Sequence, residues 1–227
     1  MSRLPLIIAL VLGGLLTGTG FAFIKNVVGD KPVASGPLPF AVDANNTPDF
    51  PAVKTGDFDL IDQYGRQRRS ASRNGSHQLV FFGYAQCKAI CSVALPSIAE
   101  TVDLLKGMGS AVTPVLITVD PKRDTVDALR VAVRDIHPTM EGLTGPEEKL
   151  EAAYKAFNLE KKFLFTHPEE GDVYAHGSFI YLLAPDGEFR TLFAPVTSPA
   201  RMAEITAGYI QQDRDKDREG QKHASLH

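Results

Sequence analysis

Cys87 and Cys91 are the only two cysteines of the 227-residue chain, and they lie four positions apart. They follow an apolar stretch at residues 79–82 and lead into a helical pattern. Residues four apart on a helix share a face, with Cβ atoms about 5–6 Å apart. Two sulfur atoms at that spacing can close a disulfide or bind one soft metal ion. The chemistry of the pair therefore depends on which third group faces it.

A histidine is the third group to look for, because thiolate together with imidazole suits copper and zinc. His77 precedes a strand at the end opposite the cysteines and is expected at the surface, His137 at the end of a helix, and His167 in an acidic turn. His176 differs because it directly precedes an apolar strand, and sites in α/β sheets gather at strand ends. From the residues alone, His176 is a candidate ligand, with a plain loop histidine as the alternative.

The pair could also act without a metal. A cysteine that opens a helix lies at the positive end of the helix dipole, which stabilises thiolate, and Lys88 adds a cation. We therefore expect Cys87 to be the more acidic and more exposed thiol, and Cys91 the more buried one. Two further uses stay open: a structural disulfide, whose small loop constrains the unfolded chain little, and thiol–disulfide exchange, with Cys87 attacking and Cys91 resolving.

The elements that must position these residues alternate between strand-like and helix-like between residues 56 and 212. This alternation predicts an α/β fold with a sheet flanked by helices, and a final hairpin makes the sheet mixed. A helix is expected to open at Cys87, because the apolar residues from Ile90 onward recur at helical spacing, and Pro96 should kink or restart it. Further helices are expected from Asp124 as N-cap, from Pro146 and from Ser198. The expected strands are 58–61, 78–82, 112–119, 179–183 and 189–193.

The ends of the chain differ from this middle part. Residues 4–24 are uncharged and mostly apolar, and about 20 such residues are needed to cross a bilayer. This run exceeds the apolar core of a cleavable signal peptide, so residues 1–25 are expected to form a transmembrane anchor. The proline-rich residues 26–55 predict a semi-rigid tether. Residues 213–227 are mostly charged or polar and are expected to be a disordered tail, which leaves residues 56–212 as one folded domain.

The net charge of the chain and its expected cellular location limit the classes of possible partner. The net charge of −3 and the lack of a basic stripe argue against nucleic acid as a partner. A long domain behind an apolar segment, without an Arg-rich presequence, is typical of a protein of the bacterial inner membrane with its domain in the periplasm. Disulfides persist in that compartment, so reduction of the cysteine pair would have to be supplied.

Four stretches of the sequence resemble the SCO/SenC family, membrane-anchored copper proteins that serve cytochrome c oxidase assembly. Residues 56–66 resemble the opening hairpin of the family, and residues 81–91 its phenylalanine-glycine-tyrosine and Cys-x-x-x-Cys motifs. Residues 118–125 are similar to its Asp-Pro-x-Arg-Asp-Thr signature, and residues 176–189 to its histidine, strand and hairpin block. The four occur in order and at the intervals of the family.

The resemblance implies a thioredoxin-like fold and a copper site formed by Cys87, Cys91 and His176. Asp120 would then lie near the site, with a helix-entry turn residue as the alternative reading. Copper, as Cu(I) or Cu(II), would be delivered to the CuA site of cytochrome c oxidase subunit II or to another copper-receiving membrane protein. Other copper chaperones or thiol reductants would be the remaining partners.

This chain departs from the family motif beside the cysteines. Lys88, Ala89 and Ser92 stand where the family usually has proline, aspartate and proline. A cation near the sulfurs favours the thiolate form and opposes binding of Cu²⁺. We therefore expect this chain to favour Cu(I) binding, or redox work without metal, more than a usual family member does. The two functional hypotheses are therefore a membrane-anchored copper chaperone and a periplasmic thiol–disulfide oxidoreductase that uses Cys87 and Cys91 without obligatory metal.

Overall fold

The computed structural model describes residues 53, 56–85, 87, 89–168 and 171–224. The expected anchor at residues 1–25 and nearly all of the expected tether at residues 26–55 lie outside these ranges. Within the ranges, none of the helices combines the length and the hydropathy that crossing a bilayer requires.

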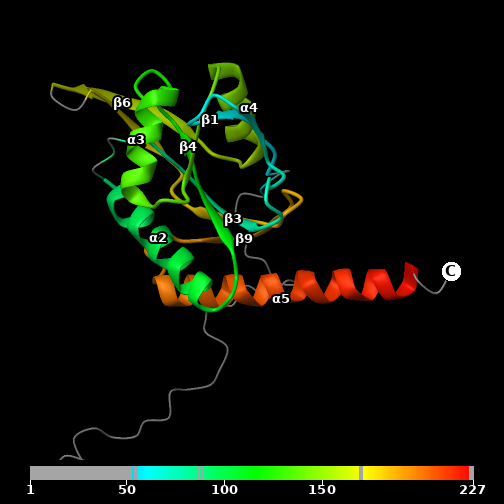
Figure 1. Ribbon diagram of the computed structural model, residues 1–227. Helices are drawn as coiled ribbons and strands as arrows, with labels where there is room; N and C mark the ends of the chain where they lie inside the picture. Colours follow the sequence, from blue (N-terminus) through cyan, green and yellow to red (C-terminus); the bar gives the residue numbers. More distant parts are fainter. Residues whose placement is uncertain (1–52, 54–55, 86, 88, 169–170, 225–227) are drawn as a thin grey trace, which may run out of the picture. The chain divides into compact units, whose positions relative to one another are not determined.

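The central sheet of the described region is mixed, as the sequence predicted. Its strand order is β2-β1-β5-β4-β3-β8-β9 (Figure 1). β3 runs parallel to β4 and β4 parallel to β5, whereas β1, β2, β8 and β9 pair antiparallel to their neighbours. The bounds are β1 (Asp59–Asp62), β2 (Gln67–Arg69), β3 (His77–Gly83), β4 (Val112–Thr118), β5 (Glu141–Thr144), β8 (Ile180–Leu183) and β9 (Phe189–Phe193).

Helices cover both faces of this sheet, because successive residues of a strand point to opposite sides. Leu79 and Phe81 of β3 pack with α2 (Cys91–Gly107), α3 (Val126–Ile136) and α5 (Pro199–Ala224). Val80 and Phe82 pack on the other side with α4 (Glu147–Ala156). β3 is buried along its whole length. The segment that carries the two cysteines therefore begins at the end of a central, buried strand.

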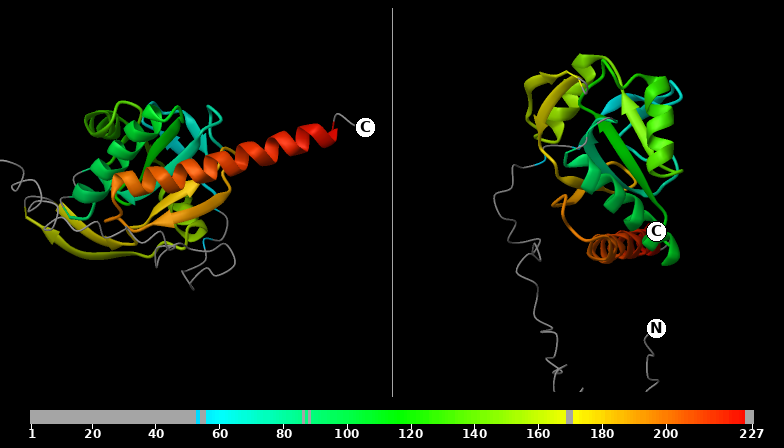
Figure 2. Two further views of the ribbon diagram at one scale, coloured as in Figure 1. Left: turned by 90° about the horizontal axis from the view of Figure 1, so that it is seen from below. Right: turned by 90° about the vertical axis from the view of Figure 1, so that its left-hand side faces the viewer.

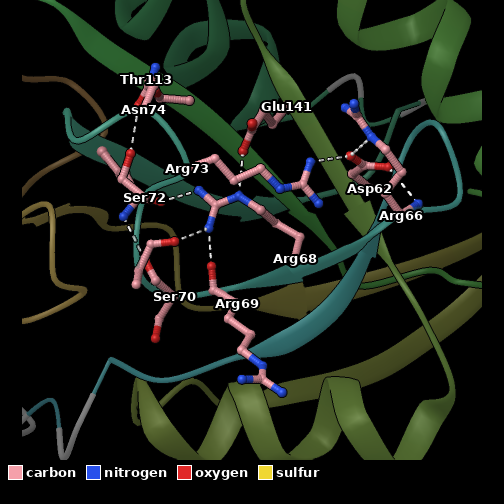
Figure 3. Close-up of polar contacts among 12 residues, drawn as sticks. Asp62, Arg66, Arg68, Arg69, Ser70, Ser72, Arg73, Asn74, Thr113 and Glu141 are labelled. Atoms are coloured by element: carbon pink, nitrogen blue, oxygen red, sulfur yellow. Dashed lines mark hydrogen bonds and ion pairs between the residues drawn. The ribbon is translucent and has the colours of Figure 1, made fainter.

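Arg68 is a buried cation that joins three strands. Its side chain is fully buried, and its Nε donates to Glu141 of β5 at 2.7 Å (Figure 3). It also donates to the Gln78 side chain of β3 and to the carbonyl oxygens of Arg69 and Ala71. A buried charge is tolerated when it is paired and hydrogen-bonded in this way, so Arg68 fixes β2 at the edge of the sheet.

Two helix details bear on the expectation. Helix α2 continues through Pro96 from Cys91 to Gly107, so of the two effects expected of Pro96, a kink or a restart, the restart does not occur. Helix α3 is capped by Thr125, whose hydroxyl accepts the N–H of Ala128 at 3.3 Å, and not by Asp124. The carboxylate of Asp124 is instead hydrogen-bonded inside the domain, which leaves the cap to the next residue.

The expected disorder of residues 213–227 is wrong for residues 213–224, where α5 continues to Ala224. The final turns extend past the sheet (Figure 2). Their arginine, lysine, glutamate and glutamine residues are good helix formers, and Asp213 anchors the helix where it leaves the domain. Asp213 accepts hydrogen bonds from Arg190 at 3.0 Å and lies 2.8 Å from His77 Nε2. His77, expected at the surface, is therefore buried beneath α5.

A second, two-stranded sheet was not predicted. β6 (Lys161–His167) pairs antiparallel with β7 (Gly171–His176), and Lys161 lies opposite His176. Five consecutive residues of β6 are exposed, so the strand lacks the alternation of apolar and polar residues that identifies a strand packed on a core. This hairpin places His176 at the end of a strand.

Candidate metal centre

Three side chains from distant parts of the sequence meet at the end of β3. One ligand atom each from Cys87, Cys91 and His176 lies within 4.8 Å of the others. Cys91 is buried, whereas Cys87 and His176 are half-buried. Among the described residues, this is the one group of three or more His, Cys, Asp or Glu side chains close enough to share an ion. The fold therefore brings together the three residues that the resemblance implied.

The two cysteines form a disulfide, with Cα atoms 5.7 Å apart. The predicted order of burial is confirmed, because Cys91 is 1% exposed and Cys87 is more open. The expectation that Cys87 opens the helix is wrong: α2 begins at Cys91, and Cys87 lies in a turn, where its N–H donates to the Tyr84 carbonyl at 3.1 Å. The first helical turn therefore begins at the inner cysteine, and greater exposure is what distinguishes Cys87.

Gly83, the last residue of β3, makes room for the inner sulfur. A Cβ atom at this position would lie 3.0 Å from Cys91 Sγ and 2.9 Å from the Phe81 ring. Both distances are shorter than the roughly 3.5–4.0 Å at which non-bonded heavy atoms pack best. A side chain at residue 83 would thus displace the sulfur or the ring, so glycine is required by packing.

The His176 ring is held with one nitrogen free for a ligand. Its Nδ1 lies 2.9 Å from the Gly177 carbonyl oxygen, which can only accept, so Nδ1 carries the proton and Nε2 the lone pair. The ring packs edge-on against Phe81 and Tyr84, with centroids 6.3 and 6.5 Å apart. Burial lowers the pKa of His176, and the hydrogen bond to Gly177 offsets this only in part. The neutral ring is the form that binds metals.

Two buried aspartates support the site without joining it. Asp120 pairs with Arg123 in its own turn, and it is not a member of the group formed by Cys87, Cys91 and His176. Asp124 accepts the Thr118 hydroxyl at 2.6 Å and the Ala85 N–H at 3.1 Å. Burial raises the pKa of Asp124 more than these hydrogen bonds lower it.

Sequence reasoning missed this role of Asp124, which holds the loop that leads to Cys87. The available signal was the run of residues 118–125, in which a strand end and two aspartates come close together.

The comparisons with known proteins agree with this arrangement. The family model described as SCO1/SenC matches residues 46–211. A SCO2-like protein of Rickettsia conorii is 35% identical over 153 residues, which cover 66% of this chain and 74% of that protein. The mitochondrial SCO2 homolog of Bos taurus is 37% identical over 158 residues, which cover 67% of this chain and 57% of the bovine protein. The chain thus spans little more than half the length of the bovine relative.

Solved structures show the same fold. ScoI of Arabidopsis thaliana with copper bound has 26% identity and a TM-score of 0.65, covering 70% of this chain and 99% of that one. ScoI of Bradyrhizobium japonicum with copper bound has 27% identity and a TM-score of 0.60, covering 68% of this chain and 98% of that one. The predicted thioredoxin-like α/β fold is confirmed, and a Cys-Cys-His group is a donor set that could hold copper.

Proposed function

Because the chain belongs to the SCO1/SenC family, we propose that it binds copper and delivers it to cytochrome c oxidase during assembly of the CuA site. Cys87, Cys91 and His176 are the proposed ligands. The observation that carries the proposal is that their ligand atoms lie within 4.8 Å of one another. Two soft sulfur ligands and one imidazole are a suitable donor set for Cu(I), and the ion is the cargo.

Loading requires the reduced cysteines. A thiol reductant must supply two electrons and two protons to the Cys87–Cys91 bond, and the reductant is oxidised to a disulfide in turn. Copper then binds the thiolates, and the thiol protons are released to solvent. The redox state of the pair therefore decides whether the site can be loaded.

Release fits the uneven burial of the ligands. Cys91 is buried, while Cys87 and His176 are half-buried, so incoming ligands of a recipient can approach the ion from the Cys87 and His176 side. Exchange of ligands one at a time would move copper without free ion in solution. The recipient that we propose is cytochrome c oxidase subunit II or another copper-receiving membrane protein.

The location is part of the proposal. Residues 1–25 would anchor the chain in a bacterial inner membrane, and residues 26–55 would tether the domain in the periplasm. The support is the uncharged run at residues 4–24, since about 20 apolar residues span a bilayer. In membranes washed with alkaline carbonate, the full chain should stay with the lipid and a chain lacking residues 1–25 should be released; release of both would contradict the anchor.

A copper titration tests the ligand set. The full chain is reduced and titrated with Cu(I) against a competing chelator, and one ion per chain is expected. His176→Ala should weaken binding by at least about 10-fold, because loss of groups that merely orient ligands already costs about 10–100-fold. His167→Ala is the matched control, since His167 lies in the same hairpin outside the group. Equal affinity of the wild type and His176→Ala would refute the assignment.

Thiol–disulfide exchange is a second candidate function, favoured by the disulfide between a half-exposed and a buried cysteine. The reduced Cys87 thiolate would attack a client disulfide, and Cys91 would then displace the client thiol and restore the internal disulfide. This chemistry does not use His176. Insulin reduction that is lost in Cys87→Ser and kept in His176→Ala, without copper, would support it; no reduction by the wild type would exclude it.

A further inference from the structure

Arg123 lies in the turn between β4 and α3, and its guanidinium contacts three separate parts of the domain. Its Nε donates to the Asp120 carboxylate in the same turn. Its Nη2 donates to the backbone carbonyl of Asp172 in β7, and its Cζ lies 5.4 Å from the centroid of the Tyr84 ring. A planar guanidinium can bond two acceptors and stack on a ring at once, which an ammonium cannot do.

The contact with β7 depends on a glycine. Gly171 has a φ of +74°, and a Cβ atom there would lie 2.6 Å from Arg123 Nη1. The hairpin therefore leaves space for the guanidinium at the start of the strand that ends at His176. Because strand backbone is stiff when paired, a bond at Asp172 restrains the path of β7 toward the site.

Through Tyr84, Arg123 is one residue away from the proposed ligands. The Tyr84 ring packs edge-on against His176, with centroids 6.5 Å apart, and against Tyr174 of β7, at 6.3 Å. The Tyr84 backbone carbonyl accepts the Cys87 N–H at 3.1 Å. Tyr84 is thus in contact with the chain segments that carry two of the three proposed ligands.

From these contacts we infer that Arg123 is a positioning residue for His176. The contacts above join it to Asp120, Asp172 and Tyr84, so it restrains both the strand that carries the imidazole and the ring against which the imidazole packs. The inference rests on the proposed function, because it concerns the imidazole as a copper ligand. Without the guanidinium, the imidazole should lose its place beside the sulfurs while the cysteines keep theirs.

A double-mutant cycle in the full chain tests the inference. Copper(I) affinity is measured by chelator competition for the wild type, Arg123→Met, His176→Ala and the combined variant. Arg123→Met should weaken binding by about 10–100-fold, as is typical for groups that orient ligands. In the His176→Ala background the same change should have no effect, because the group that Arg123 positions is already absent.

Arg130 provides a matched control. It pairs with an aspartate three residues earlier, Asp127, at 2.9 Å, and its Nε donates to the Gln63 carbonyl at 3.1 Å. Its Cζ lies 5.9 Å from the Tyr64 ring centroid. Arg130→Met removes the same kinds of contact away from the site, so copper affinity should stay at the wild-type value.

The outcomes separate the inference from the proposed function. If the wild type and His176→Ala bind equally, the proposed ligand set is wrong, and the inference fails with it. If His176 matters but Arg123→Met is neutral, or weakens binding equally with and without His176, the inference alone is overturned. If thermal unfolding shows that Arg123→Met is not folded, Arg123→Lys, which keeps the charge, replaces it in the cycle. A loss of copper affinity that disappears in the His176→Ala background then supports the inference, and neutrality or an equal loss in both backgrounds overturns it.

Discussion

Gly83→Ala tests whether the packing beneath the site sets the position of the inner sulfur. The added Cβ would meet the Phe81 ring at 2.9 Å, Cys91 Sγ at 3.0 Å and Leu116 Cδ1 at 3.4 Å. Restoring ordinary contact distances of about 3.5–4.0 Å requires shifts of roughly 0.5–1 Å. Phe81, Leu116 and Cys91 are all buried and have little space to move. The strain should therefore be shared by the inner sulfur and by the Phe81 ring, against which His176 packs.

The expected cost follows from overpacking of a buried site, which is typically about 1–3 kcal/mol. In a domain of this size each kcal/mol lowers Tm by about 2–4 °C. Calorimetry of the full chain should show this decrease, and the reduced variant should bind Cu(I) at least about 10-fold more weakly. Gly107→Ala is the control, since a Cβ at the end of α2 meets nothing within 4 Å. If Gly83→Ala matched the wild type in both Tm and copper affinity, the packing argument would be refuted.

Three further predictions concern the helices and the thiols. Burial alone would raise the pKa of Asp213, but hydrogen bonds from Arg190 and His77 hold it below the ordinary value. Asp213→Asn should therefore destabilise the domain at neutral pH. The difference from wild type should shrink as pH falls below about 3.9, the ordinary pKa of the unfolded chain, and vanish only below the lowered pKa of the folded state, which urea unfolding at a descending series of pH values would show. Thr125→Ala should lower the free energy of unfolding by about 0.5–2 kcal/mol through loss of the α3 cap, and no change in urea unfolding would contradict the cap. In the reduced chain, Cys87 should be alkylated faster than the buried Cys91, as mass spectrometry of timed samples can show; the reverse order would contradict the burial argument.

Much of the sheet could be predicted from the sequence, because β3 and β4 are buried on both faces and appear as continuous apolar runs. The hairpin of β8 and β9 was marked by a short Gly-containing turn. The β6–β7 hairpin could not be predicted in this way. It packs neither face of β6 on the core, so the periodicity that reveals strands is absent.

The end of α5 shows a second reason why structure could not be predicted from the sequence. A run of charged residues indicates disorder when no partner is visible in the sequence, but Asp213 has partners from β3 and β9. Likewise, Asp124 looked like a helix cap because its partners, Thr118 and Ala85, are brought to it by the tertiary fold. In both cases the interaction that decided the local structure joins separate elements.

The candidate site was predictable in its residue types and only in part in its geometry. The spacing of Cys87 and Cys91 identified the pair, and the position of His176 before an apolar strand made it a candidate. Their convergence depends on the β6–β7 hairpin, which was not predicted, and on the turn that separates Cys87 from α2. The roles of Gly83 and Arg123 follow from contacts that appear only in the fold.

The central claim is that the imidazole and the two sulfurs hold one copper ion together. X-ray absorption at the copper edge, on the reduced full chain loaded with one Cu(I), tests this claim most directly. The account predicts two sulfur ligands and one imidazole, with the imidazole scattering lost in His176→Ala and kept in His167→Ala. A wild-type copper shell without imidazole, or one that His176→Ala leaves unchanged, would contradict it.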